Sequence, residues 1–220
     1  MGRFLVVEGL IGVGKTSLCR LLASEWGARL VLEPSATNPF LEPFYRDPAR
    51  YAFPVQMYYL MNRWRQQESI RQEDLFHPLV VSDYLWEKDR MFAEKTLEEL
   101  ELELYGQIAG ALGQGAPKPD LVVYLHAPMD VVVERIAKRS APGEERIRTE
   151  YLEDLAERYE RLLAGWRACP VLRIDNTRLD YVDDPAARTA VLRRIKRALD
   201  GEPDELPAPD PRQPSLFGGS

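Results

Sequence analysis

The octapeptide Gly9–Thr16 restricts the fold of this chain most, because it fits the pattern G-x-x-x-x-G-K-[ST]. It directly follows the apolar run Phe4–Val7, and the residues after it carry leucines at helical spacing (Leu18, Leu21, Leu22). Such glycines let successive backbone N–H groups converge on phosphate oxygens, and the N-terminus of a following helix favours an anion. The segment therefore predicts a strand, a phosphate-binding loop and a helix in that order.

The loop also assigns individual contacts to a bound nucleotide. Lys15 is expected to reach the β- and γ-phosphates of ATP, and the Thr16 hydroxyl is expected to ligate Mg²⁺. The loop residues expected to bind ATP are Gly9, Gly12, Val13, Gly14, Lys15, Thr16 and Ser17. The sequence has no N-K-x-D element for reading guanine, and the chain is short for a motor ATPase. The pattern therefore favours a small-molecule kinase.

Short apolar runs alternate with longer helical patterns, which is typical of a parallel sheet covered by helices. The predicted strands are Phe4–Val7, Leu30–Leu32, Leu79–Val81, Leu121–Leu125 and Val171–Ile174. The predicted helices are Lys15–Trp26, Pro48–Gln72, Glu87–Leu112, Met129–Lys138, Thr149–Trp166 and Pro185–Leu199. We expect one α/β domain of the P-loop NTPase fold over residues 1–200, with a five-stranded parallel sheet of order 2-3-1-4-5 flanked by helices. The two long central helices suit a contact with a second subunit.

Composition excludes several kinds of protein. The formal net charge is −6, which argues against a nucleic-acid partner. The sequence contains no run of about 18 apolar residues that could span a membrane, and its N-terminus lacks the pattern of a signal peptide. Cys19 and Cys169 lie far apart without metal-ligand spacing, as expected of reduced thiols in a cytoplasmic protein. Residues 201–220 are rich in proline and acid and are predicted to form a disordered tail.

Two carboxylates follow predicted strands, Glu33 after the second and Asp83 after the third. Ligands of open parallel sheets bind beyond the carboxyl ends of the strands, so both should face the same crevice as the loop. A kinase needs a carboxylate that accepts the hydroxyl proton and a held metal ion. We assign Asp83 as the general base and Glu33 as a supporting acid near the metal or the hydroxyl.

Four segments together resemble the deoxynucleoside kinases, a family that includes cytidine-, adenosine-, guanosine- and thymidine-type enzymes. They are Gly9–Ser17, Glu33-Pro34, Tyr51–Arg63 and Glu150–Glu153, and they occur in the family's order within residues 3–195. The resemblance implies transfer of the γ-phosphoryl group of ATP to the 5′-hydroxyl of a deoxynucleoside, as in nucleotide salvage. It also implies a homodimer.

The same resemblance implies roles at the nucleoside. Gln56 matches the glutamine that reads the base through two amide hydrogen bonds, and Arg63 with Asp89 matches a charged pair beside the base. Tyr45 and Glu150 match the pair that binds the sugar 3′-hydroxyl. Arg63 lies seven residues after Gln56, so both project from one helix face. Phe53 or a neighbouring aromatic residue is expected to pack on the base. An Asp89 acceptor facing an exocyclic amine mildly favours adenine or cytosine.

A cationic lid is expected at about residues 135–150. Arg135 and Arg139 fall at the family's lid positions, four residues apart on one helix face, and the polar segment Ser140–Glu145 follows them. A mobile cationic segment can close over the γ-phosphate and stabilise the charge of phosphoryl transfer.

The chain departs from the family pattern at two positions. Asp83 is followed by Tyr84 where the family has an arginine that touches phosphates, and Ala141 replaces a usual lid arginine. The missing charge could come from Arg90 or Arg146. Two alternatives therefore stay open, a nucleoside monophosphate kinase of the thymidylate type and a kinase-like subunit that binds nucleotide without turnover. The first needs an additional basic group for the acceptor phosphate.

The predicted tail carries one more motif. Gln213–Phe217 resembles the Q-x-x-L-F peptide with which bacterial proteins bind the replication sliding clamp, and an exposed Leu-Phe pair suits an apolar groove. Clamp binding in a pulldown should be lost when residues 213–217 are removed.

Overall fold

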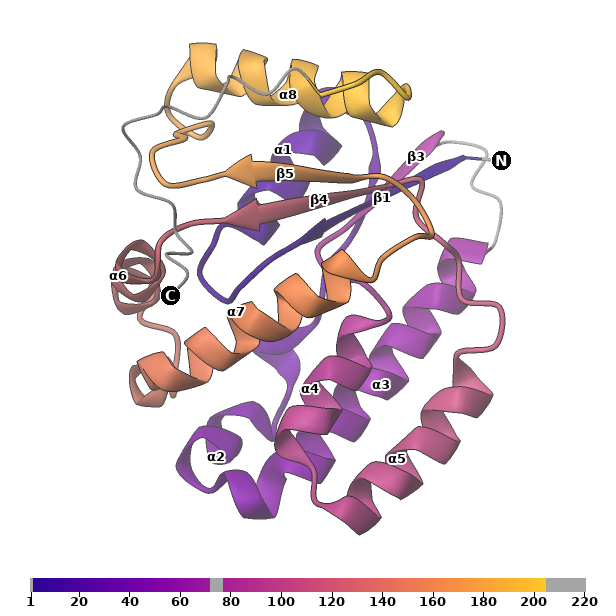
Figure 1. Cartoon of the computed structure of the whole chain (residues 1–220), viewed down its shortest axis with the longest axis vertical. Helices are drawn as coiled ribbons and strands as arrows, with labels where there is room; N and C mark the ends of the chain where they lie inside the picture. The colour runs from indigo at the N-terminus through magenta and orange to yellow at the C-terminus, as the bar shows by residue number, and fades with distance from the viewer. Residues whose placement is uncertain (1, 72–76, 205–220) are drawn as a thin grey trace, which may run out of the picture.

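The fold is built on a five-stranded parallel sheet of order β2-β3-β1-β4-β5 (Figure 1). The computed structural model describes residues 2–71 and 77–204. The strands are β1 (Arg3–Glu8), β2 (Arg29–Val31), β3 (Leu79–Ser82), β4 (Leu121–His126) and β5 (Val171–Asp175). The predicted order and the parallel pairing are confirmed, and each strand end lies within one residue of its predicted position.

Both faces of the sheet are covered, which explains why the strands read as continuous apolar runs. Leu5 and Val7 point to the face that carries α1 (Lys15–Trp26) and α8 (Pro185–Leu199). Phe4 and Val6 point to the opposite face, where α6 (Met129–Arg139) and α7 (Thr149–Ala164) pack. Figure 1 shows α1 and α8 on one side of the sheet and α7 on the other.

A layer of helices extends beyond the sheet on the α7 side (Figure 1). It contains α2 (Leu41–Arg46), α3 (Pro48–Arg71), α4 (Lys88–Thr96) and α5 (Glu99–Leu112), with the short 3₁₀ helix η1 (Ser35–Thr37) leading into it. α2 packs on α3 through Phe44, Ala52 and Val55. Leu60, Ala93 and Tyr105 join α3, α4 and α5 in a separate apolar cluster.

The prediction of one helix over Glu87–Leu112 is wrong, because the chain breaks between α4 and α5. Leu97 has an extended backbone (φ −92°, ψ 145°) and packs against the cluster around Leu60. Glu98 then caps α5 in a reciprocal arrangement with Glu101, a capping box in which glutamate takes the place of serine or threonine. The unusual cap explains why the sequence reads as continuous helix.

Between α6 and α7 lies the segment predicted to form a lid. Ser140 ends α6 with a left-handed backbone (φ 51°), and the 3₁₀ helix η2 (Glu144–Arg146) follows. The start of the predicted tail is bound to α8, because Glu202 pairs with Arg197 and Asp204 pairs with Arg194. The clamp-like motif Gln213–Phe217 lies outside the described residues. No helix in the described parts of the chain is long and apolar enough to cross a membrane.

Candidate active site

A cavity of ≈ 630 Å³ opens at the carboxyl ends of β1, β2 and β3. Parallel strands bring the phosphate-binding loop, Glu33 and Asp83 to this edge, as the sequence predicts. The predicted site residues that line the cavity are Gly9, Gly12, Gly14, Lys15, Thr16, Ser17, Glu33, Tyr45, Gln56, Arg63, Asp83, Arg135 and Arg139. Val13, Asp89 and Glu150 do not line it. One cavity therefore joins the loop to most of the residues predicted to bind the nucleoside.

The loop has the backbone that its glycines predict. Gly12 (φ 82°) and Gly14 (φ 105°) lie in the left-handed region. A Cβ atom on Gly12 would come within 2.7 Å of Ile136 in α6, and one on Gly14 within 2.9 Å of the Tyr181 hydroxyl. Any other residue at these positions would strain both the backbone and the packing.

Lys15 bends back over the loop. Its Nζ donates to the carbonyl oxygens of Gly9 (2.8 Å) and Leu10 (2.9 Å). Burial, together with the positive charge of Lys88, lowers the pKa of Lys15 to about 8. A polyanion in the loop would reverse this effect, because it favours the charged ammonium.

Asp83 is held on the loop side of the cavity. Its Oδ2 accepts a hydrogen bond from the Thr16 hydroxyl (2.7 Å), and its Oδ1 accepts one from the backbone N–H of Glu33 (2.7 Å). A P-loop hydroxyl beside a strand-end aspartate is the pair that holds Mg²⁺ in P-loop NTPases. The backbone contact also fixes where the Glu33 side chain begins.

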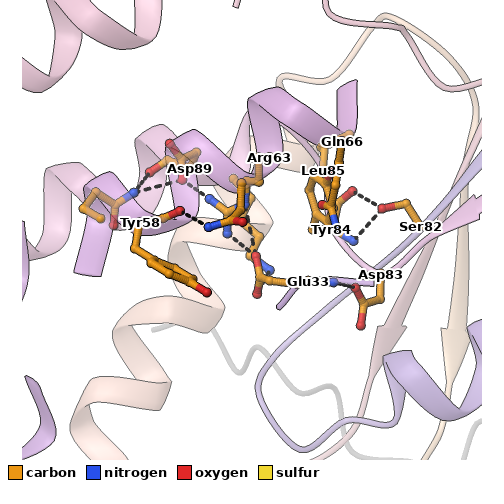
Figure 2. A network of polar contacts seen from close by, with 12 residues as sticks. Glu33, Tyr58, Arg63, Gln66, Ser82, Asp83, Tyr84, Leu85 and Asp89 are labelled. Atoms are coloured by element: carbon orange, nitrogen blue, oxygen red, sulfur yellow. Dashed lines mark hydrogen bonds and ion pairs between the residues drawn. The ribbon is translucent and has the colours of Figure 1, made fainter. Parts of the chain in front are cut away.

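Glu33 and Asp89 both form ion pairs with Arg63, from two sides of its guanidinium group (Figure 2). Arg63 donates through Nε (3.0 Å) and Nη2 to Glu33 Oε1, and through Nη1 to Asp89 Oδ1. Its guanidinium also lies 5.1 Å from the ring centre of Tyr59 and 5.5 Å from that of Tyr84. The arginine is thus fixed by charge and by aromatic faces together.

The charge around Glu33 keeps it ionised. Burial alone would raise the pKa of Glu33, but the charges of Arg63 and Lys88 outweigh burial and lower the pKa to about 2. At neutral pH the side chain is a carboxylate.

Asp89 orients Gln56 from outside the cavity. The Gln56 Nε2 donates to the Asp89 carbonyl oxygen (2.8 Å) and to Asp89 Oδ1 (3.0 Å), while the Tyr105 hydroxyl donates to Asp89 Oδ2 (2.6 Å). Two acceptors facing the amide require its nitrogen on that side. Asp89 therefore does not face a ligand directly, so the geometry removes the reason for preferring an exocyclic amine of adenine or cytosine.

Only one member of the predicted sugar-binding pair lines the cavity. Tyr45 lines the cavity beside the lid segment, where a Cβ on Gly143 would lie 2.8 Å from its ring. Glu150 is exposed in the first turn of α7, and its neighbour Tyr151 lines the cavity instead. Sequence spacing places Glu150 near the site but does not decide which residue of that turn points inward.

The lid arginines both reach the cavity. Arg135 Nη2 donates to the carbonyl oxygen of Asn176 (2.8 Å), and its buried Nη1 has no hydrogen-bond partner in the described part of the chain. Arg139 donates through Nε to Glu144 (3.0 Å). A buried guanidinium nitrogen without an acceptor costs free energy, so an anion that binds there would stabilise this arrangement.

Neither arginine suggested for the charge missing at Tyr84 lies at the site. Arg90 pairs with Glu94 (2.7 Å) and has a side chain that is 80% exposed. Arg146 pairs with Glu145 (3.5 Å), is likewise exposed, and does not line the cavity. The sequence offers both as free cations, but their helices point them to solvent.

Several cavity residues were not found from the sequence. Lys88 lines the cavity and is 4% exposed, although the run Glu87–Arg90 reads as a solvated charged face. The aromatic residues in the cavity wall are Phe44, Tyr45, Tyr59, Phe92, Tyr151 and Tyr159. Phe53, expected to pack on the base, instead joins the cluster around Leu60 and lines a shallow hollow elsewhere. Helical periodicity alone does not tell these faces apart.

The donor set suits a metal ion that is bound mainly through phosphates. Within residues 2–71 and 77–204 no group of three His, Cys, Asp or Glu side chains forms a metal cage. Mg²⁺ commonly uses one or two protein ligands together with substrate phosphates and water. The adjacent Thr16 hydroxyl and Asp83 carboxylate fit that arrangement.

Comparison with known proteins agrees with the geometry. The family model described as deoxynucleoside kinase matches residues 5–200. A deoxyguanosine kinase of Bacillus subtilis (strain 168) is 34% identical over 201 residues, covering 89% of this chain and 97% of its own. A deoxyadenosine/deoxycytidine kinase of the same organism is 30% identical, covering 82% and 85% respectively. Among solved structures, a deoxyadenosine kinase from M. mycoides with bound dATP has a TM-score of 0.73 at 20% identity, covering 88% of this chain and 99% of its own.

Proposed function

This chain belongs to the deoxynucleoside kinase family, and on that premise we propose that Glu33 is the general base of its reaction. The enzyme is an ATP-dependent phosphotransferase that acts on a deoxynucleoside. A bond forms between the 5′-oxygen and the γ-phosphorus, the bond from that phosphorus to the β-phosphate oxygen breaks, and ADP leaves. The hydroxyl proton passes to a carboxylate.

The order of residues across the cavity carries this assignment. Thr16 and Asp83 lie at the loop, Glu33 comes next, and Arg63 with Gln56 follows. A nucleoside whose base meets Gln56 and whose 5′-hydroxyl meets the γ-phosphate must pass Glu33 between them. Asp83 Oδ2 accepts from Thr16, the P-loop hydroxyl expected to ligate Mg²⁺, which supports a role of Asp83 beside the metal. We therefore exchange the roles that the sequence suggested for the two acids.

The phosphates would be held by the loop amides, Lys15 and the lid arginines Arg135 and Arg139. A bound Mg²⁺ would supply positive charge that offsets the negative charge developing during transfer. We propose that the Thr16 hydroxyl and Asp83 hold it, rather than Thr16 and Glu33. The reason is the 2.7 Å contact of Thr16 with Asp83, while Glu33 is engaged by Arg63 and Lys88.

A coupled assay of ADP production tests the acceptor. We expect turnover with at least one of the four deoxynucleosides and none with the corresponding monophosphates, because Arg63, the cation beside Gln56, is already paired with Glu33 and Asp89. Turnover with monophosphates alone would point to the thymidylate-type alternative.

Replacing Gln56 by alanine should raise the KM for the nucleoside by about 10- to 100-fold, the cost of one or two lost hydrogen bonds to a base. The KM for ATP should not change, because Gln56 lies at the far end of the cavity from the loop. Initial rates with each substrate varied in turn measure both constants. Asn62→Ala is the matched control, since Asn62 lies on the same helix and donates to the Tyr58 carbonyl (2.8 Å), and neither residue lines this cavity. A defect confined to ATP would contradict the assignment.

Binding of ATP at pH 8 should take up a proton. Free Lys15 has its pKa lowered to about 8, so roughly half of it is neutral there, and bound phosphates favour the ammonium. As pH rises above 8, ATP affinity should therefore fall. Calorimetric titrations in buffers with different enthalpies of ionisation measure the uptake. Heats that do not depend on the buffer at pH 8 would contradict this account of Lys15.

We also propose a cytoplasmic location for the protein. We further propose that two copies of the chain form a homodimer through their long helices. Leu100 and Leu104 support the dimer, because these two leucines of α5 are 81% and 48% exposed. Light scattering of the purified chain distinguishes a dimer from a monomer.

A further inference from the structure

Of the two lysines that line the cavity within the described ranges, Lys15 is half-buried and holds phosphate in the proposed function, whereas Lys88 is buried and has no role in it. Its Nζ lies 3.3 Å from Glu33 Oε2 and 3.9 Å from Glu8 Oε1. It is the first residue of α4, where the helix dipole disfavours a cation. Burial also costs an ammonium most of its hydration. Both penalties make this an unfavourable place for a lysine that serves only the fold.

Glu8, the second carboxylate beside Lys88, is held in place by hydrogen bonds. Glu8 accepts hydrogen bonds from the backbone N–H of Leu85 (2.7 Å) and Gly9 (3.0 Å) and from the Tyr159 hydroxyl (2.9 Å). Glu8 therefore belongs to the end of β1, directly before the phosphate-binding loop. A lysine that contacts both Glu8 and Glu33 stands where the loop meets the proposed base.

Lys88 also lies near Lys15. Its charge is the second cause, after burial, of the lowered pKa of Lys15. Two ammonium groups that repel each other within one cavity form a site suited to a polyanion. Lys15 is assigned to the β- and γ-phosphates, so Lys88 approaches the same end of ATP from the side of the acceptor.

We propose that Lys88 contacts the phosphoryl group in transfer and supplies the cation that is missing at Tyr84. This rests on the proposed function and extends it by one catalytic residue. Glu33 and Glu8 neutralise the ammonium in this structure; when ATP and nucleoside are bound, the ammonium donates to an oxygen of the γ-phosphate. Its withdrawal from Glu33 also leaves that carboxylate a stronger proton acceptor, since a neighbouring cation weakens a base.

Lys88→Met tests the proposal, with Lys88→Arg as the conservative variant. Lys88→Met should lower kcat by about 10²–10³-fold, the usual loss for one preorganised donor to developing charge. Its affinity for the β,γ-imido analogue of ATP should fall by at least about tenfold, while its affinity for ADP stays unchanged. Lys88→Arg, which keeps a cation, should recover much of the rate and the affinity for the analogue. Both affinities are measured by calorimetry with Mg²⁺ present.

Lys95→Met is the matched control on the same helix. Lys95 pairs with Asp154 (3.0 Å) outside the cavity lining, so its removal should leave the rate and both affinities unchanged. Equal loss of affinity for ADP and the analogue, an unchanged rate in Lys88→Met, or no recovery in a folded Lys88→Arg would overturn the proposal. Turnover by the wild-type protein tests the proposed function separately. The affinities for ADP and for the analogue can be measured even if the protein shows no turnover.

Discussion

Glu33→Gln is expected to lower kcat by about 10²–10⁴-fold, the usual contribution of a general base. The amide keeps the size of the side chain and can still accept a hydrogen bond from Arg63, but it cannot take a proton from the 5′-hydroxyl. ATP affinity should be retained, because the loop amides and Lys15 do not depend on Glu33. Single-turnover rates combined with a direct binding measurement separate the two effects.

The difficulty is that Glu33 also balances two buried cations, and breaking a buried ion pair costs about 3–5 kcal/mol of stability. Asp89→Asn is the matched control, because Asp89 pairs with the same arginine but does not line the cavity. It should share the loss of thermal stability and weaken the nucleoside, with kcat kept within about tenfold. If both variants lose kcat equally, the effect of Glu33→Gln is structural and Glu33 is not the base.

The pH dependence of stability gives a second view of Glu33. Its pKa in the folded chain is lowered from the ordinary 4.5 to about 2, so the charged form is favoured by folding. The stabilisation is therefore present above about pH 4.5 and is lost as pH falls towards 2. The difference of about 2.5 units corresponds to roughly 3 kcal/mol in this nearly buried group.

Asp83→Asn is expected to impair the metal rather than the proton transfer. The asparagine carbonyl oxygen can still accept from the Glu33 backbone, while its NH₂ group faces Thr16, so the local fold should persist. The loss of one negative charge beside Thr16 should raise the Mg²⁺ concentration for half-maximal rate by at least about tenfold. At moderate Mg²⁺ the rate should fall by about 10²–10³-fold, and excess Mg²⁺ should recover part of it.

Glu33→Gln serves as the comparison for this second prediction. It should lower the rate at every Mg²⁺ concentration without moving the half-maximal point. The opposite pattern, in which Glu33→Gln shifts the Mg²⁺ dependence and Asp83→Asn does not, would return the general-base role to Asp83.

The frame of the site could be read from the sequence because its parts are local. Gly9–Thr16 carries its own strand, turn and helix, and parallel connections place Glu33 and Asp83 at one edge of the sheet. The sequence does not specify which partners the side chains of Glu33 and Asp83 contact. The contact of Glu33 with Arg63 arises only when α3 packs across the strand ends, and that of Asp83 with Thr16 only when α1 packs against β3.

The misplaced residues share a physical reason. Lys88 lies in a run of charges that reads as solvated, and its burial depends on Glu33 and Glu8, which come from two other strand ends and neutralise it. Phe53 and Gln56 are neighbours on one helix, yet one packs into the cluster with Leu60 and the other lines the cavity. Such choices depend on contacts between α3, α4 and α5, which helical periodicity does not specify.

The most direct test of this account is a crystal structure with a deoxynucleoside, Mg²⁺ and the β,γ-imido analogue of ATP. We predict that the 5′-oxygen lies within about 2.6–3.2 Å of a Glu33 carboxylate oxygen. Asp83 should lie at the metal, hydrogen-bonded to its water or ligating it directly. A 5′-oxygen bound to Asp83, with Glu33 still closed on Arg63 and Lys88, would contradict the assignment.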